Sequence, residues 1–382
     1  MSKTRVTLYT TIAVTMALWS LSPLESFAVT AKKTPFIYSV WMPYWKKTAG
    51  VAETTAHLST LQEISPFSYN IKKDGSLVDD MRIGSEPWPT LFANASSKKI
   101  SIIPSISSGA SETIFSILSN QKTRTSHIKN IVDLVNKKGF AGIDIDYENK
   151  TVATKSSFSA FLKELAIELK KTNKTLSCTI EPRTPASSMF YTPPKGQVER
   201  ANDYIVIGKY CDEIRIMAYD QTTIDVRLND ERGGKNLYAP IADFTWVNKV
   251  LIEAKKTLPA NKIMLGIPTY GYEYEVTPIG GRLRNYKIVR SISYKDALEL
   301  AAKIGTKPNR NQAGELSFTY SVENAATPKS TTTPATATRL VWFADASSVN
   351  GLVMLAKAQK LRGVTLFKID GLGDPAIWEK LK

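Results

Sequence analysis

Residues 139–148 read Gly-Phe-Ala-Gly-Ile-Asp-Ile-Asp-Tyr-Glu, and this stretch governs how the rest of the chain is interpreted. Alternate side chains of an extended strand share a face, so Asp144, Asp146 and Glu148 point the same way. Three like charges on one face repel each other, and folding alone gives no reason to place them there. A solvated edge strand is the alternative, but β-branched and aromatic flanks and a preceding helix that ends at Gly139 favour a buried parallel strand. An acidic row in such a strand is expected to line a site.

Short apolar runs alternate with amphipathic helices along the chain. Helical crossovers of this kind produce parallel strands, and eight strands fit a closed (β/α)8 barrel, an α/β fold. A doubly wound open sheet is the alternative, but it requires a glycine-rich turn after the first strand, where residues 41–45 read Trp-Met-Pro-Tyr-Trp. The expected strands are the acidic strand and Phe36–Met42, Ile64–Ile71, Ile100–Ile106, Thr175–Ile180, Glu213–Tyr219, Lys262–Pro268 and Gly363–Ile369.

The segment 272–339 interrupts this alternation between the seventh and eighth strands of a barrel domain expected to span residues 35–382. The stretch Ala325–Thr338 is rich in Thr, Pro and Ala, which predicts a flexible tip. We therefore expect a small α+β insertion in the barrel. Its expected elements are strand-like Arg284–Arg290, a helix near Tyr294–Ile304 and strand-like Glu315–Ser321.

Residues 1–28 have the pattern of a signal peptide. Lys3 and Arg5 form a basic start, Val6–Leu21 is largely apolar, and Ser26-Phe27-Ala28 offers small residues for cleavage. We expect a secreted, cell-wall or periplasmic protein with no membrane span after signal removal. The alternative is a protein anchored in the membrane by an uncleaved leader, although the apolar stretch is slightly short for a span of ~20 residues.

The formal net charge of the chain is +15. The sequence has no arginine-rich helix and no interleaved basic-aromatic motif, so nucleic acid is not an expected partner. The excess positive charge favours an anionic polymer or a cell surface as neighbour.

The chain has two cysteines, Cys178 and Cys211, on neighbouring expected strand regions. A disulfide after export fits this placement, and two buried free thiols fit it at least as well. Their spacing does not suit zinc, and His57 and His127 are the two histidines of the chain. We expect neither a metal nor another cofactor.

With the acidic strand in fourth place, the sequence resembles glycoside hydrolase family 18, which includes chitinases and N-acetylglucosaminidases of bacterial walls and spores. The resemblance covers nearly all of the chain after the signal. It rests on GIDIDYE at 142–148, MAYD at 217–220, GIPTYG at 266–271 and VWFADA at 341–346. Two positions depart from the family pattern. Ala141 stands where an acidic residue is usual, which we expect to affect buried electrostatics, and Phe367, followed by Lys368, stands where a tryptophan is common.

The resemblance implies a specific chemistry. In family 18 the substrate's own acetamido carbonyl attacks the anomeric carbon, so a single general acid suffices. It implies that Glu148 is this acid and later the base, favoured in its protonated form by the neighbouring carboxylates. Asp146 would turn between Asp144 and Glu148 and hold the acetamide N–H. Tyr219 would hydrogen-bond the acetamide oxygen, and Asp220 would contact the same sugar.

Aromatic and polar side chains near the expected strand ends are further substrate-binding candidates, although barrels also bury aromatic rings as packing. Glu181 and Arg183, at the end of the fifth strand, are polar enough to face the cleft and have no assigned role. The substrate-binding set comprises Asp220, Met217, Phe367, Tyr69 and Trp41, and other aromatics near strand ends are Tyr44, Trp45, Trp88, Tyr270 and Tyr272.

The leading functional prediction is an exported, retaining hydrolase of β-1,4-linked N-acetylglucosamine polymers, either peptidoglycan-type or chitin. Its expected partner is such a polysaccharide, and the expected state is a monomer. A non-catalytic carbohydrate-binding protein on the same barrel is the alternative, but such relatives usually lose the equivalent of Glu148. A third possibility is a cell-surface adhesion protein, if the leader stays uncleaved and the cleft is blocked.

Overall fold

The computed structural model describes residues 35–192, 195, 199–221, 225–233, 236–279, 283–323 and 336–381. The predicted signal peptide, residues 1–28, and most of the predicted tip lie outside the described residues. Residues 35–382 form one compact unit. In the described part of the chain, no helix is both long and apolar enough to cross a membrane.

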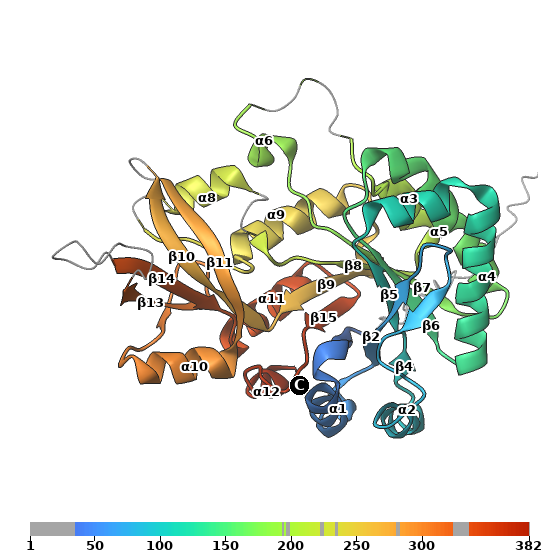
Figure 1. Cartoon of the computed structure of the whole chain (residues 1–382), viewed down its shortest axis with the longest axis horizontal. Coiled ribbons are helices and arrows are strands. Elements are labelled where there is room, and N and C mark those ends of the chain that lie inside the picture. Colours follow the sequence, from blue (N-terminus) through green and yellow to red (C-terminus); the bar gives the residue numbers. More distant parts are fainter. Residues whose placement is uncertain are drawn as a thin grey trace, which may run out of the picture. The chain divides into compact units, whose positions relative to one another are not determined.

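A closed barrel of eight parallel strands forms the centre of this unit (Figure 1). The strand order is β1–β15–β9–β8–β7–β6–β5–β2, and β2 pairs with β1 to close the ring. The predicted (β/α)8 fold is therefore confirmed. The strands are β1 Ile37–Pro43, β2 Glu63–Ile71, β5 Ser105–Ser108, β6 Gly142–Tyr147, β7 Thr175–Ile180, β8 Glu213–Ile216, β9 Ile263–Pro268 and β15 Gly363–Phe367.

Three strands differ from their expected bounds by more than one residue at an end. The third is divided into β4 Ser101–Ile102 and β5, with Pro104, which has no backbone N–H for a sheet, in the break. The sixth ends at Ile216 instead of Tyr219, because the N–H groups of Ala218 and Tyr219 bond to carbonyls only two residues back. The eighth ends at Phe367 instead of Ile369. A short strand β3, Leu77–Asp79, adds antiparallel to β2.

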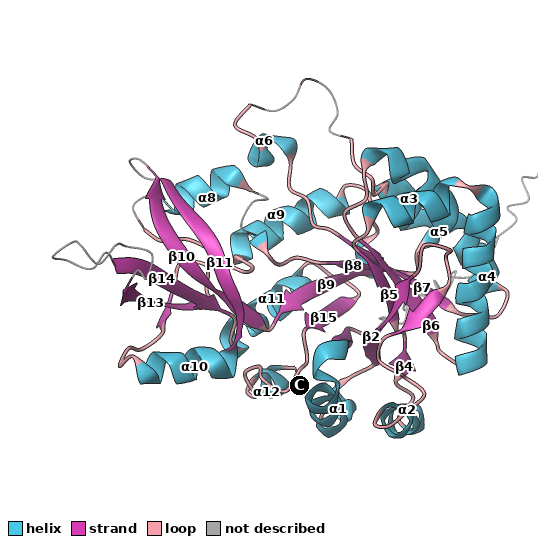
Figure 2. Cartoon of the chain, viewed as in Figure 1, coloured by secondary structure: helices cyan, strands magenta, loops and turns pink. Residues whose placement is uncertain are grey.

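Helices connect the barrel strands and cover the outside of the sheet (Figure 2). Before the acidic strand, the Asn120 side chain accepts hydrogen bonds from two N–H groups of the first turn, and Gly139 ends the helix at a φ of 69°. The helices are α1 Lys47–Ala56, α2 Trp88–Ser97, α3 Ser111–Ser119, α4 Gln121–Lys138, α5 Lys155–Lys170, α6 Ala186–Met189, α7 Tyr204–Tyr210, α8 Val226–Gly233, α9 Phe244–Lys255, α11 Ala346–Ala358 and α12 Ile377–Lys380.

A second, antiparallel sheet lies between β9 and β15 in the chain, where the insertion was expected. Its strand order is β11–β10–β14–β13–β12, and one helix follows β11. Residues 336–338, expected to belong to a flexible tip, are instead strand residues that pair with 321–323. The elements are β10 Tyr270–Ile279, β11 Leu283–Ser293, α10 Tyr294–Lys303, β12 Asn309–Arg310, β13 Leu316–Glu323 and β14 Thr336–Phe343.

The Glu315 carboxylate links the insertion to the barrel through hydrogen bonds. It is buried and accepts hydrogen bonds from the N–H groups of Ile241 and Ala242, both at 3.0 Å, just before α9. It also accepts one from the indole of Trp342 in β14. One side chain thus ties β14 to the loop before α9, which limits how far the insertion can move against the barrel.

A disulfide joins Cys178 in β7 to Cys211, just before β8. The structure therefore selects the bonded form over the pair of buried free thiols. The bond crosslinks neighbouring barrel strands and closes a loop of sequence separation 33.

Candidate active site

A cavity of about 300 Å³ opens at the carboxyl ends of the barrel strands. Active sites of such barrels lie at this end, because the strand-to-helix loops emerge there. The structure gathers most of the predicted site residues around it, namely Trp41, Asp146, Glu148, Met217, Tyr219, Asp220 and Phe367. Thr179, Glu181 and Pro182 from the end of β7 also line the cavity, together with Phe67 from β2.

Two predicted residues do not line the cavity. Asp144 lies below it, fully buried among the barrel strands. Tyr69 is buried in the hydrophobic core, where its ring packs edge-on against Phe140. The structure therefore gives no support to a sugar contact by Tyr69.

Asp144 is surrounded by hydrogen-bond donors. Ser105 and Ser177 each donate to it at 2.7 Å, one to each carboxylate oxygen. The Thr179 hydroxyl lies 2.9 and 3.0 Å from the two oxygens, and the Arg215 guanidinium lies 3.6 Å away. These contacts hold both carboxylate oxygens of Asp144 in a fixed orientation at the base of the acidic row.

Asp146 lies one step further along the same face and is also buried. Burial is the main reason why the pKa of its carboxyl is raised well above the usual value, and the charges of Glu148 and Asp144 raise it further. In the described part of the chain, Oδ1 of Asp146 has no hydrogen-bond partner. Asp146 thus lies between Asp144 and the cavity, with one carboxyl oxygen free and with its raised pKa favouring the protonated form.

Glu148 directly follows β6, and its backbone N–H bonds to the carbonyl of Ser108 at 2.8 Å. Asn149 then turns the chain away with a φ of 55°. Burial raises the pKa of the Glu148 carboxyl, and the charge of Glu181 adds to this effect. A glutamate with a raised pKa at the wall of a cavity can act as a general acid.

Another part of the cavity wall comes from the loop after β8, and Tyr270 at the start of β10 supports this loop. The Tyr270 hydroxyl donates to Oδ1 of Asp220 at 2.7 Å, and Asp220 has a φ of 56°. The Tyr219 ring stacks on Phe367 at a centroid distance of 5.3 Å, and Trp41 meets Phe367 edge-on at 6.0 Å. These rings give the cavity an aromatic floor beside its carboxylates.

The sequence model of the family described as glycosyl hydrolases family 18 matches residues 40–371. The chain belongs to this family. A cortical fragment-lytic enzyme of Bacillus anthracis is 26% identical over 329 residues, which cover 84% of this chain and 67% of that protein. This family membership shows that the protein is a glycoside hydrolase.

Solved structures of family 18 proteins have the same fold. The Bacillus cereus spore cortex-lytic enzyme SleL matches with a TM-score of 0.70 and 24% identity, covering 91% of this chain and 74% of that one. A chitinase from Chromobacterium violaceum matches with a TM-score of 0.70 and 20% identity, covering 91% and 98%. At these identities the likeness shows the fold alone.

The two departures from the family 18 pattern fall in different places. Ala141 precedes β6 and does not line the cavity. Phe367 does line it, and its ring contacts Trp41, Tyr219 and Tyr270. The phenylalanine therefore provides an aromatic surface at the position where family 18 commonly has a tryptophan.

The sequence patterns missed two residues that contact Glu181 beside the cavity of this family 18 chain, Lys150 and Asn202. Lys150, two residues after the acidic row, has a fully buried side chain 3.7 Å from Glu181. Asn202 donates to the other oxygen of Glu181. Arg183 does not line the cavity, because its guanidinium lies over the Tyr204 ring at 3.1 Å. Among the described residues, no cluster of His, Cys, Asp and Glu could hold a metal ion.

Proposed function

We propose that this chain hydrolyses β-1,4-linked N-acetylglucosamine polymers with retention of configuration, using the substrate's acetamido group as the nucleophile. The carrying observation is the placement of Glu148 and Asp146 in one cavity with Tyr219 and Asp220. A proton donor at one wall and polar groups for an acetamide are what such a reaction requires.

The proposed roles follow from the position of each side chain. Glu148 protonates the leaving oxygen and later takes a proton from water. The free oxygen of Asp146 accepts the acetamide N–H, which aims the acetamide carbonyl at the anomeric carbon. The Tyr219 hydroxyl donates to that carbonyl oxygen. Asp220, oriented by Tyr270, holds the same sugar.

The proposed natural substrate is a peptidoglycan-type glycan, with chitin as the second candidate. The family relative named as a cortical fragment-lytic enzyme supports a wall glycan, and the net charge of +15 suits an anionic wall. The likeness to a chitinase keeps chitin as a candidate. We further propose that residues 1–28 direct export and that the protein acts on the wall as a monomer.

A carbohydrate-binding protein without activity is a different class of function on the same barrel. Glu148 counts against it, because its side chain is present and lies in the cavity. A binding protein needs the aromatic floor but has no use for a half-buried glutamate whose pKa is raised beside it.

Release of a fluorescent aglycone from a chitobiose glycoside separates these functions. Glu148→Gln is expected to lower kcat by about 10²–10⁴-fold, the usual cost of losing a general acid, and to leave sugar binding intact. Glu164→Gln is the matched control, because Glu164 pairs with Arg124 on the outer helices away from the cavity. Equal turnover by wild type, Glu148→Gln and Glu164→Gln would contradict the proposal.

A further inference from the structure

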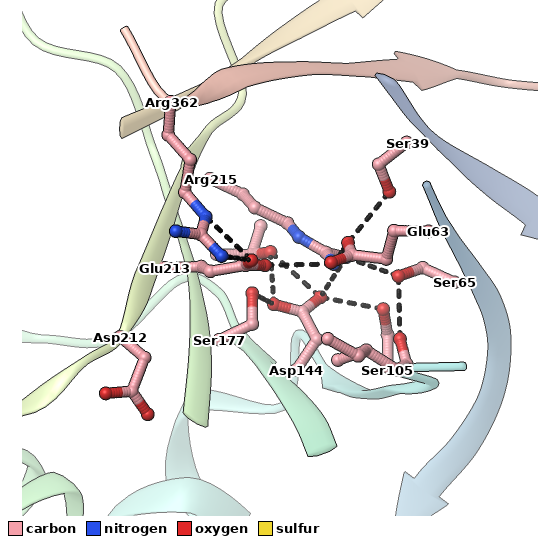
Figure 3. A network of polar contacts seen from close by, with 12 residues as sticks. Ser39, Glu63, Ser65, Ser105, Asp144, Ser177, Asp212, Glu213, Arg215 and Arg362 are labelled. Carbon is pink, nitrogen blue, oxygen red and sulfur yellow. Dashed lines mark hydrogen bonds and ion pairs between the residues drawn. The ribbon is translucent and has the colours of Figure 1, made fainter. Parts of the chain in front are cut away.

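The barrel interior below the cavity contains a charged network centred on Arg215 (Figure 3). Arg215 lies in β8, and its side chain is fully buried. Its guanidinium forms an ion pair with Glu63 of β2 and donates to the Ser65 hydroxyl at 2.6 Å. It also lies 3.6 Å from Asp144 and 3.7 Å from Glu213.

This network is unusual for its location. Bulky branched apolar side chains normally fill the interior of such barrels. Removing charges from water is costly, and buried ion pairs are often no more stabilising than apolar residues of the same volume. Stability alone therefore gives little reason to keep Arg215, and its contact with Asp144 points to the chemistry above.

We infer that Arg215 is a positioning residue that holds the Asp144 carboxylate in a fixed orientation, so that the acidic row keeps the geometry that proton transfer by Asp146 and Glu148 requires. This inference rests on the proposed function. The guanidinium reaches Oδ2 of Asp144, the oxygen that also accepts from Ser105. Ser177 and Thr179 donate to Oδ1, so both oxygens are engaged by donors and a proton on Asp144 would displace one of them.

The groups that face Asp144 make Arg215 the main positive charge of this network. β5 and β7 present the hydroxyls of Ser105, Ser177 and Thr179, which do not ionise in the working pH range. The facing carboxylates are Asp146 on the same strand, Glu213 on β8 and Glu63, which Arg215 links to Asp144. Arg362 pairs with Glu213 at 2.7 Å, and within the described part of the chain it forms no ion pair with Asp144. Arg215 and Arg362 thus share a partner and differ in their contact with Asp144.

The test compares pH profiles of kcat/KM for hydrolysis of the fluorescent chitobiose glycoside. Arg215→Met is combined with Glu63→Gln, so that the carboxylate of Glu63 is not left charged without its partner, while Glu213 keeps its pair with Arg362. The acidic limb should move to higher pH, because the row of carboxyl groups loses a nearby positive charge and binds a proton more tightly. kcat should fall by about 10–100-fold through misplacement of the acidic row, with KM changed less. Arg362→Met is the matched control and should leave the acidic limb in place.

Two further variants separate positioning from stability. The pair Arg215→Gln with Glu63→Gln keeps hydrogen bonding without charge and should show the same shift of the limb. Arg215→Lys keeps the charge and should restore the wild-type limb. A folded double variant with a wild-type profile, or the same shift in Arg362→Met, would overturn the inference. The inference would also be overturned if neither double variant folded and the activity of Arg215→Lys fell only in proportion to its unfolded fraction. Wild-type protein without activity on the glycoside would instead refute the proposed function.

Discussion

The buried ammonium of Lys150 lies 3.7 Å from the carboxylate of Glu181, beside the cavity that Glu181 and Glu148 line together. The two charges act on Glu148 in opposite directions. Glu181 raises the pKa of the Glu148 carboxyl and Lys150 lowers it, while burial makes the largest contribution, upward. The ion pair therefore adjusts the pH range over which Glu148 keeps its proton.

Removing the charge of Glu181 should narrow that range. In Glu181→Gln the pKa of Glu148 falls, so Glu148 loses its proton at lower pH. The alkaline limb of the kcat/KM profile should move to lower pH, while kcat at the optimum falls by less than about tenfold, since the acid itself remains. Glu168→Gln, which alters an exposed ion pair on α5, is the control. An unchanged limb in Glu181→Gln would show that this carboxylate does not influence the acid.

Removing the charge of Lys150 should have the opposite effect. In Lys150→Met the pKa of Glu148 rises, and the alkaline limb should move to higher pH. Methionine suits the site, because the Lys150 side chain is fully buried and its ammonium lies 4.7 Å from the Phe158 ring centre. Lys171→Met, on the exposed pair with Glu168, is the control. If the alkaline limb of Lys150→Met moved to lower pH, as expected for Glu181→Gln, the two charges would not act on Glu148 in opposite directions and the account would be contradicted.

The disulfide should contribute to stability and not to chemistry. Closing a loop of sequence separation 33 is worth roughly 3–4 kcal/mol in the chain-entropy model. Cys178→Ser with Cys211→Ser should lower the free energy of unfolding in urea by about this amount, with kcat unchanged in the folded protein. Reduced wild type serves as the comparison and should match the double variant. Equal stability with and without the bond would rule out this role.

The insertion should form one wall of the cleft and favour long substrates. Tyr270 starts the second sheet and donates a hydrogen bond to Asp220, which lines the cavity, so the insertion begins next to the cavity wall. Replacing residues 272–339 with a short linker should raise KM for long oligosaccharides more than for a small chromogenic glycoside. Deleting residues 325–335 alone should be tolerated and provides the control. Equal effects on both substrates, in a folded variant, would assign the insertion to stability or partner binding.

The sequence predicted those parts of the fold and the site that depend on local patterns. The alternation of apolar runs and helices identified eight barrel strands, and the period of two along β6 placed Asp144, Asp146 and Glu148 on one face. Contacts between distant strands left no such signal. Arg215 and Glu63 are 152 positions apart, and only the closed barrel brings them together.

Burial was the other quantity that local patterns did not reveal. No sequence pattern marks Lys150 as buried, yet its side chain is enclosed beside Glu181. Tyr69 looked like a ring at a strand end, yet it packs in the core, because aromatic residues suit both environments. Residues 336–338 looked like a loop by composition, but pairing with β13 makes them part of a strand.

The most direct test of the central claim compares two fluorogenic disaccharides that differ in the N-acetyl groups of their sugars. Acetamido participation requires that group on the reacting sugar, so kcat/KM for the chitobiose glycoside should be high and the matched cellobiose glycoside should be essentially inert. A thiazoline analogue of the cyclised intermediate should inhibit wild type. Comparable turnover of the two glycosides would contradict the account and would indicate a hydrolase in which a second carboxylate is the nucleophile.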